Sequence, residues 1–242
     1  MQTLILGDGH LGRAIAATAA DRGVPTTLVG RPTSGRHEAD VFAVSDLVID
    51  ASCGEAVAAN VTAALDGGIR RFVIATTGWT GERDRVAGAL RTNGASAVVT
   101  ANFSLGVALF GRLVEVATDL FGSVDGFDPY IVEWHRRGKT DRPSGTAIEL
   151  ARRMVERHPG LTGPGDLETV SVRAGSSPGM HLVGFDAAGE SVELRVTARD
   201  RSAYATGVLA AADWLRRSPR APGIHPFDAV VDELLARRPA AA

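Results

Sequence analysis

The distribution of hydrophobic residues divides the chain into two parts. Up to Thr100, short apolar runs alternate with alanine-rich amphipathic segments. The strand-like runs occupy residues 3–6, 26–29, 47–50, 72–75 and 97–100, and the helix-like segments occupy residues 10–22, 55–66 and 81–93. Strand, helix and strand repeated in this way predict a parallel sheet covered on both faces, with right-handed crossovers. We therefore expect a doubly wound α/β domain.

After Asn102 the alternation stops, and the strand-like runs become longer and lie closer together. They cover residues 130–134, 168–174, 179–186 and 191–198, with a hairpin turn expected at residues 186–190. Helix-like segments lie at residues 105–120, 147–157, 202–217 and 227–238. This part predicts a mixed or antiparallel sheet accompanied by helices.

Composition narrows the classes of function. The 242 residues, 45% of them hydrophobic, suffice for one large domain or two small ones. A formal net charge of −2 without a basic run makes nucleic acid an unexpected partner. The first apolar run is short and follows no basic residues, so we expect neither a signal peptide nor a membrane span. The single cysteine, Cys53, excludes an internal disulfide and favours a reducing compartment, so we expect a cytoplasmic protein.

A glycine-rich turn follows the first strand-like run. "LILGDGHLGRAIA" places three glycines between a strand and a helix. Their spacing permits a tight turn, leaves bare backbone for a pyrophosphate and opens a helix start that favours anions. We expect a dinucleotide here, with a simple glycine-rich turn as the alternative. The residues assigned to it are Gly7, Asp8, Gly9, His10, Leu11 and Gly12.

The end of the second strand-like run bears on the choice of cofactor. A carboxylate at that position would bind the ribose hydroxyls of NADH. The sequence instead reads "LVGRPTSGR", with Arg31, Thr33, Ser34 and Arg36 after Gly30. Guanidinium and hydroxyl groups suit a 2′-phosphate, so we expect NADPH, with NADH as the alternative.

A second candidate site surrounds Lys139, the only lysine among the 26 lysines and arginines of the chain. It follows His135, Arg136 and Arg137 in "IVEWHRRGKTDRPSGTA" at residues 131–147. Lysine differs from arginine because only its ammonium can release a proton near neutral pH. The clustered cations predict a site for a small, multiply charged acid, and a solvated basic loop is the alternative.

A helix is expected to begin directly after this loop. Ser144 or Thr146 lies at its start, and Thr146 with Glu149 is spaced as a capping box. Its first amides and the positive end of its dipole could hold a carboxylate.

The remaining histidines predict no metal site. His37, His158 and His225 lack metal-ligand spacing with one another. We interpret His181, within a strand-like run, as a structural residue.

Several stretches together resemble one family. The Lys139 stretch is similar to the signature of dihydrodipicolinate reductases, in which a glutamate, a histidine pair and a lysine precede D-x-P-S-G-T-A. The other similar stretches are "ATTGW" (75–79), "ANFSLGVAL" (101–109), "VRAGSSPGMHLVGF" (172–185), "ARDRSAYATGVLAAADWL" (198–215) and "PGIHPFDAVVDELL" (222–235). The resemblance spans the chain.

The resemblance implies two domains and a reaction. Residues 1–103 with 202–242 would form a Rossmann dinucleotide-binding domain, and residues 104–201 an α/β, mixed-sheet domain for substrate binding and tetramer assembly. The reaction would be NAD(P)H-dependent reduction of a cyclic imine dicarboxylate, dihydrodipicolinate, in the diaminopimelate route to lysine.

Roles of individual residues follow from the same resemblance. His135 and Lys139 match the catalytic pair, with Lys139 supplying a proton or holding a carboxylate. Gly145 and Thr146 match residues that bind a substrate carboxylate through backbone amides, and Arg201 matches an arginine near the substrate pocket. The residues assigned to substrate binding are Arg136, Ser144, Gly145, Thr146 and Arg201. Those that match cofactor contacts are Thr76, Thr77, Gly78, Asn102 and Phe103, and the adjoining Ala75 and Ala101 are assigned to the same site.

The sequence also departs from the family at several positions. Arg136 replaces the second histidine, and Ala75 and Ala101 replace a glycine and a proline. A guanidinium could keep affinity for a dicarboxylate, or it could mark a reductase of a different cyclic imine or imino acid. A dinucleotide-binding scaffold or sensor without catalysis is the alternative of another class, although it would have no need of the pair His135 and Lys139.

Overall fold

The computed structural model describes residues 2–32, 39–200 and 202–237. The chain forms two compact units, one made of Met1–Leu105 with Arg201–Ala242 and the other of Gly106–Asp200. The second unit begins two residues later and ends one residue earlier than the part expected at residues 104–201. In the portion of the chain described, no helix is both long and apolar enough to cross a bilayer.

The first unit is built on a parallel sheet with the strand order β10-β5-β4-β3-β1-β2. Its strands are β1 (Thr3–Leu6), β2 (Thr26–Val29), β3 (Leu47–Asp50), β4 (Arg71–Ile74), β5 (Ser96–Val99) and β10 (Gly223–Pro226). Every residue of β1 and β3 is buried, as expected of central strands in a parallel sheet. The strand order reverses at β1, between β2 and β3, and a crevice for a ligand typically opens at such a point.

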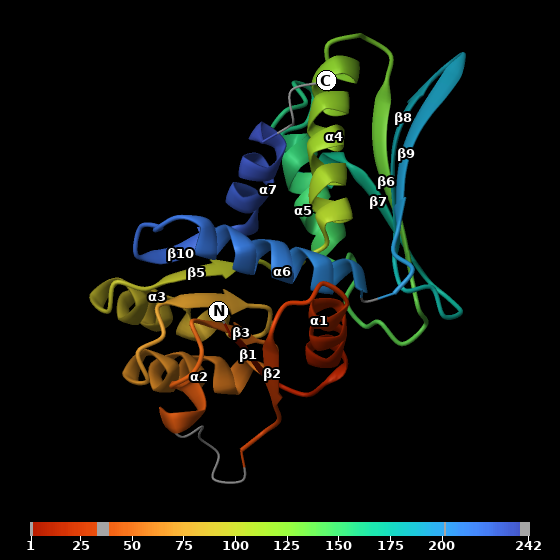
Figure 1. Ribbon diagram of the computed structural model, residues 1–242. Helices are drawn as coiled ribbons and strands as arrows, with labels where there is room; N and C mark the ends of the chain where they lie inside the picture. Colours follow the sequence, from red (N-terminus) through yellow and green to blue (C-terminus); the bar gives the residue numbers. More distant parts are fainter. Residues whose placement is uncertain (1, 33–38, 201, 238–242) are drawn as a thin grey trace, which may run out of the picture. The chain divides into compact units, whose positions relative to one another are not determined.

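Helices cover both faces of this sheet. They are α1 (His10–Asp21), α2 (Gly54–Asp66), α3 (Arg83–Thr92), α6 (Ser202–Arg217) and α7 (Phe227–Ala236), with short 3-10 helices η1 (Ala39–Phe42) and η2 (Thr80–Glu82). Helix α1 packs beside α6 over one face, and α2 lies beside α3 on the other (Figure 1). Alternate sheet residues such as Leu4, Leu6 and Phe72 form a core with α2 and α3.

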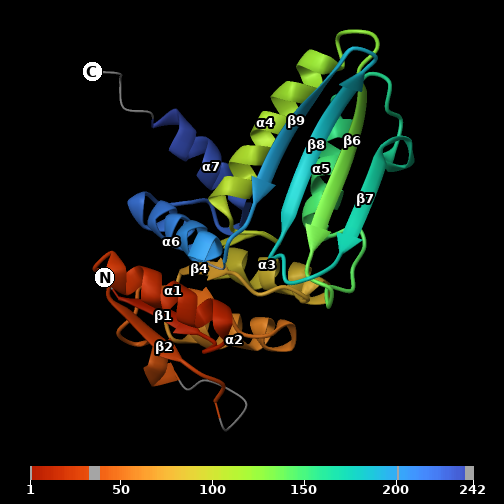
Figure 2. The same ribbon diagram turned by 90° about the vertical axis from the view of Figure 1, so that its right-hand side faces the viewer.

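The second unit is a four-stranded sheet, ordered β7-β6-β8-β9, with two helices on one face (Figure 2). Its elements are α4 (Leu105–Phe121), β6 (Asp128–His135), α5 (Gly145–Val155), η3 (Pro164–Asp166), β7 (Glu168–Arg173), β8 (Met180–Ala187) and β9 (Glu190–Thr197). Strand β6 pairs parallel with β7 and antiparallel with β8, which pairs antiparallel with β9. Ile131, Val183 and Phe185 pack against both helices.

The predicted fold class is confirmed, since a parallel sheet is followed by a mixed one. The strand-like runs and helix-like segments lie at observed elements, with ends shifted by a few residues. The hairpin between β8 and β9 is tighter than predicted, because only Ala188 and Gly189 separate the strands. Strand β10 was not predicted, because "GIHP" is short and contains a proline. It forms because the edge of β5 offers it backbone partners.

Candidate active site

The turn between β1 and α1 leaves its backbone bare on one side. Gly7 has a φ of +106°, and a Cβ there would lie 2.4 Å from the carbonyl oxygen of Ala51. A Cβ on Gly12 would lie 1.8 Å from the carbonyl oxygen of Gly7. Gly9 has open space around it and precedes a helix with no acidic residue in its first turn. The unobstructed backbone and the unpaired first amides of α1 fit the phosphates of a dinucleotide.

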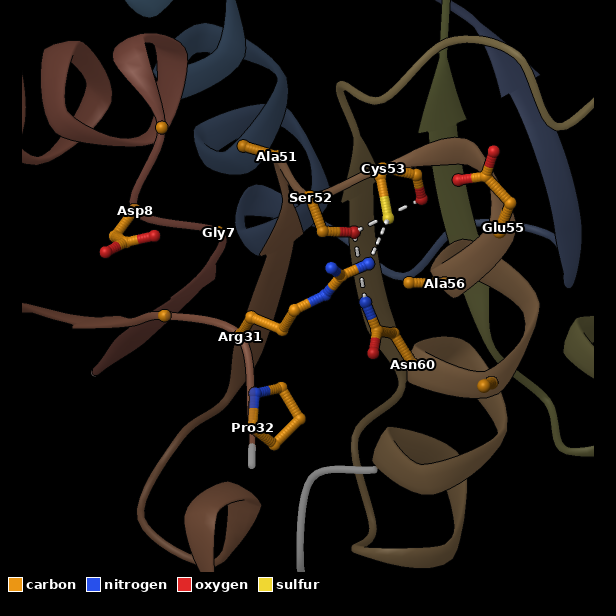
Figure 3. A pocket seen from close by; sticks show the side chains of 13 residues that line it. Gly7, Asp8, Arg31, Pro32, Ala51, Ser52, Cys53, Glu55, Ala56 and Asn60 are labelled. Atoms are coloured by element: carbon orange, nitrogen blue, oxygen red, sulfur yellow. Dashed lines mark hydrogen bonds between the residues drawn. The ribbon is translucent and has the colours of Figure 1, made fainter. Parts of the chain in front are cut away.

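A cavity of about 560 Å³ opens beside this turn (Figure 3). The guanidinium of Arg31 extends into it, with Nη2 3.8 Å from the Sγ atom of Cys53. The carboxylate of Asp8 lies against Gly30, since a Cβ at Gly30 would be 3.2 Å from Oδ2. The cavity is therefore lined by one basic residue, Arg31, and two acidic residues, Asp8 and Glu55. Its lining consists of Gly7, Asp8, Gly9, Gly30, Arg31, Pro32, Ala51, Ser52, Cys53, Glu55, Ala56, Ala59 and Asn60.

The other residues predicted to bind the cofactor have different positions. His10, Leu11 and Gly12 lie in α1, outside the lining of this cavity. The remainder follow β4 and β5, at the edge of the sheet where the carboxyl ends of the strands meet. Of these, Ala75, Thr76 and Phe103 are buried, Asn102 is half-buried, and Thr77, Gly78 and Ala101 are exposed. Thr33, Ser34 and Arg36 lie outside the described residues.

A buried carboxylate, Asp50, fixes the turn that follows β4. Its Oδ1 accepts hydrogen bonds from the hydroxyls of Thr76 at 2.6 Å and Ser52 at 2.7 Å. Its Oδ2 accepts from the amide of Asn60 at 2.8 Å. Thr76 therefore shapes the turn with its hydroxyl directed inward. Asp50 was not predicted as a member of this site, although an acid at the end of a fully buried strand needs such partners.

In the second unit, the loop after β6 leads directly into α5. Ser144 is the N-cap of this helix, and its hydroxyl accepts from the backbone N–H of Ala147 at 3.2 Å. The predicted capping box is therefore wrong, because Thr146 lies inside the first turn and Glu149 pairs with arginines of the same helix. Gly145 is exposed with open space around it, and the first turn has no acidic residue. The start of α5 is thus suited to an anion.

Glu133 lies on the buried face of β6, with its side chain fully shielded from solvent. Its Oε1 accepts three hydrogen bonds: from the backbone N–H of Ser144 at 3.0 Å, from the hydroxyl of Ser171 at 2.5 Å and from the guanidinium of Arg173 at 2.7 Å. One carboxylate oxygen therefore joins β6, β7 and the start of α5.

The second oxygen of Glu133 faces two imidazoles. Its Oε2 lies 3.2 Å from Nε2 of His135 and 3.7 Å from Nε2 of His181. The two rings meet edge to face at 5.2 Å, and Nε2 of His181 is 3.2 Å from the hydroxyl oxygen of Ser144. The three possible ligand atoms lie within 4.8 Å of one another, close enough for one metal ion. The buried guanidinium of Arg173 already neutralises this carboxylate, so the residues fit a hydrogen-bonded cluster better than a cation site.

The ionisation of this cluster follows from its burial and its donors. Burial favours a raised pKa for the carboxyl of Glu133, but the hydrogen bonds from Ser144, Ser171 and Arg173 outweigh it and lower the pKa to about 2. Burial also lowers the pKa of His181 to about 4. It lowers the pKa of His135 too, against the opposing effect of the Glu133 carboxylate. At neutral pH the carboxylate is therefore charged and both rings are neutral.

Lys139 lies on the loop between this cluster and α5. Its half-buried ammonium donates to the carboxylate of Asp141 at 2.7 Å, and this hydrogen bond lowers the pKa of Asp141. Arg173 donates to the main-chain carbonyl of Asp141 as well as to Glu133, so it ties the Lys139 loop to β6. Arg136 is exposed on the same loop, and Arg201 lies outside the described residues.

The second unit thus brings together the predicted site residues and several hydrogen-bonding partners that had not been predicted. His135, Lys139 and the start of α5 belong to one strand, loop and helix. Glu133, Ser171 and Arg173 were missed as members of this site. The available signal was periodicity, because Glu133 and His135 share the buried face of β6 with Ile131, and an acid on an apolar face must be paired.

The sequence of this chain is similar to the sequences of known proteins. A family model described as "Dihydrodipicolinate reductase, C-terminus" matches residues 106–230. A 4-hydroxy-tetrahydrodipicolinate reductase of Rhodopseudomonas palustris (strain BisB18) is 36% identical, over 93% of this chain and 95% of that protein. The chain belongs to the dihydrodipicolinate reductase family. It is therefore an oxidoreductase, and the cavity beside its glycine turn fits a nicotinamide dinucleotide.

A second curated relative and a solved structure are also similar to this chain. A 4-hydroxy-tetrahydrodipicolinate reductase of Archaeoglobus fulgidus is 35% identical, over 76% of this chain and 75% of that protein. Among solved structures, the dipicolinate-bound dihydrodipicolinate reductase from Paenisporosarcina sp. TG-14 has a TM-score of 0.73 at 19% identity, and covers 93% of this chain and 97% of its own. That structure has the same fold.

Proposed function

We propose that this family member reduces 4-hydroxy-tetrahydrodipicolinate (dihydrodipicolinate) to tetrahydrodipicolinate, in the diaminopimelate route to lysine. The observation that carries the proposal is the placement of the only lysine, Lys139, between the buried imidazole of His135 and the anion-suited start of α5. The reduced nicotinamide supplies the hydride when it is bound.

The residues of the second unit then bind the acid and deliver a proton. The start of α5, at Gly145 and Thr146, holds one carboxylate of the substrate, and the exposed guanidinium of Arg136 is available to a second. Lys139 donates the proton that completes the reduction, because its ammonium is more accessible than the imidazole of His135. His135 therefore acts as a positioning partner. Both the N–H and the hydroxyl of Ser144 are engaged within the protein, so Ser144 shapes the site.

The activity is tested by following oxidation of NADPH after addition of freshly generated dihydrodipicolinate. We expect turnover that saturates with substrate. Absence of oxidation at high enzyme concentration would contradict the proposal. Oxidation with another cyclic imine only would identify a reductase with a different substrate, and binding of NADPH without any turnover would identify a dinucleotide-binding scaffold.

We propose further that the cofactor is NADPH, bound through Arg31. Its guanidinium lies in the cavity at the end of β2, where a 2′-phosphate could accept two hydrogen bonds. The carboxylate of Asp8 beside Gly30 gives ribose hydroxyls an acceptor, which leaves a role for NADH.

Arg31→Ala should weaken NADPH more than NADH. A charge-assisted hydrogen bond contributes about 1.5–3 kcal/mol, so we expect the KM for NADPH to rise about 10- to 100-fold, with a change of less than about 3-fold for NADH. Initial rates with both cofactors measure this. Arg85→Ala, which removes an exposed arginine paired with Glu82, is the matched control. Equal losses for the two cofactors would remove the 2′-phosphate assignment.

The open face of the second sheet supports assembly into a homotetramer. Its helices cover the opposite face, and Val170, Val172 and Trp134 are 44%, 38% and 39% exposed. Neighbouring exposed apolar side chains on β6 and β7 are typical of an interface between subunits.

Val170→Lys should therefore reduce the mass of the assembly, because it places a charge in the proposed interface. Sedimentation velocity at micromolar concentration measures the mass. The control is Val124→Lys, a substitution of the same kind at a side chain that is 55% exposed after α4. A wild-type monomer, or the same mass for both variants and the wild type, would contradict this interface.

A further inference from the structure

Glu133 contacts both the imidazole of His135 and the start of α5, yet it is itself fully shielded from solvent. Through Arg173 it is also connected to the main chain of Asp141, whose carboxylate holds the ammonium of Lys139. The groups proposed to take part in proton transfer and carboxylate binding therefore converge on one buried carboxylate.

The two oxygens of this carboxylate have different surroundings. Oε1 has three donors, whereas Oε2 and Nε2 of His135 are buried and make no hydrogen bond of good geometry. These two atoms are nevertheless 3.2 Å apart, within the distance of a hydrogen bond. An ionised carboxylate has no hydrogen to donate, so the proton between them must be on Nε2. Nδ1 is then the unprotonated nitrogen of His135.

The side of the His135 imidazole opposite Glu133 faces Gly179. A Cβ on Gly179, directly before β8, would lie 3.2 Å from Nδ1 of His135 and 3.0 Å from Cε1, so a side chain at this position would require the ring to shift. Gly179 thus lies beside the Nδ1 and Cε1 atoms of the ring, and Oε2 of Glu133 lies beside Nε2. The charged and titratable groups that face it are Glu133, His181, Lys139 and Arg173.

We propose that Glu133 is a positioning residue of the reduction site: it holds His135 as the Nε2–H tautomer and keeps the imidazole, the start of α5 and the Lys139 loop in one arrangement. Glu133 acts through these groups and does not contact the substrate. The catalytic part of this inference rests on the proposed reductase function, whereas the tautomer can be measured without turnover.

Glu133→Gln tests the proposal because glutamine has nearly the same shape but presents one oxygen and one NH₂ group. The oxygen is needed by the donors of Ser144, Ser171 and Arg173, so the NH₂ group faces His135 and donates to it. Nε2 must then become an acceptor, and the proton moves to Nδ1. We expect kcat to fall about 10- to 100-fold, an effect of the size seen when the hydrogen-bond partner of a metal-bound histidine is lost.

Two measurements follow the change. Long-range ¹H–¹⁵N NMR correlation distinguishes the tautomers of histidines, and comparison with a His135→Gln variant assigns the signal of His135 among the six histidines. Steady-state kinetics gives kcat and KM separately. The matched control is Glu193→Gln on β9, which removes a charge that accepts from the hydroxyl of Tyr130 at 3.0 Å in the same sheet.

Glu133→Asp keeps the charge beside Arg173 if the glutamine variant does not fold. It withdraws the carboxylate by one bond, so we expect the Nε2–H form to lose its dominance and kcat to fall. The proposal is overturned if His135 keeps its tautomer in the folded variants, or if their kcat changes no more than that of Glu193→Gln. If the wild-type protein does not reduce dihydrodipicolinate, the proposed function and the catalytic part of this inference fail, whereas the assignment of the tautomer is still tested by the NMR result.

Discussion

Lys139→Arg should reduce kcat by about 100-fold or more, the usual contribution of general acid catalysis, while KM changes little. The substitution keeps the positive charge but replaces a group that can release a proton with a guanidinium whose pKa lies above about 12. Stopped-flow or steady-state oxidation of NADPH with dihydrodipicolinate measures the effect. Because Lys139→Arg keeps the positive charge but cannot donate the proton, it distinguishes a role of Lys139 in proton donation from a role in electrostatic binding of a carboxylate.

The neighbouring Arg137 offers the control. Arg137→Lys makes the reverse exchange on an exposed side chain of the same loop, and we expect it to leave kcat within about 2-fold, as is usual for surface substitutions. Unchanged turnover in Lys139→Arg would refute lysine as the acid and leave it a role in holding the substrate. Loss of kcat in both variants would instead show that the loop is sensitive to its shape.

Arg173→Leu should lower the free energy of unfolding by about 3–5 kcal/mol at neutral pH, because it leaves the carboxylate of Glu133 buried without its partner. Both side chains are fully shielded from solvent in the folded protein. Urea denaturation followed by circular dichroism measures the loss. Arg195→Leu is the control, since Arg195 is exposed on β9 of the same sheet, and its replacement should change stability by less than about 0.5 kcal/mol.

The decrease in the free energy of unfolding caused by Arg173→Leu should also depend on pH in a defined direction. The pKa of Glu133 is about 2 in the folded wild-type protein against 4.5 ordinarily, so its stabilising effect is complete above pH 4.5 and is lost as the pH falls toward 2. Without Arg173 the pKa of Glu133 in the folded protein rises, because fewer hydrogen bonds oppose the effect of burial. The difference between wild type and Arg173→Leu should therefore be largest at neutral pH and become smaller between pH 4.5 and 3. A difference that is constant over this range would contradict a charged Glu133 as its cause.

Most of the helices and strands could be predicted from short stretches of sequence, because the residues that determine them are neighbours in the chain. The four-residue apolar run at residues 3–6, the glycines after it and the amphipathic segment that follows coincide with β1, the turn and α1. The same holds for α6, predicted at residues 202–217 and observed at Ser202–Arg217. Strand β10 was missed, and the cap of α5 was left between Ser144 and Thr146, because each depends on a partner distant in sequence. Strand β10 needs the edge of β5, and the position of Ser144 is fixed by a hydrogen bond to Glu133.

The sequence by itself determined the two-part α/β organisation and the glycine turn, since periodicity and short motifs are properties of neighbouring residues, and the resemblance of the Lys139 stretch to the family signature indicated the candidate pair His135 and Lys139. Only the tertiary structure decided how the pair is held. The pairing of β6 with β7 places Glu133 opposite Ser171, and its antiparallel pairing with β8 places Glu133 opposite His181. Burial of that carboxylate forces it to find donors, and those donors are separated from it by up to 40 residues in sequence.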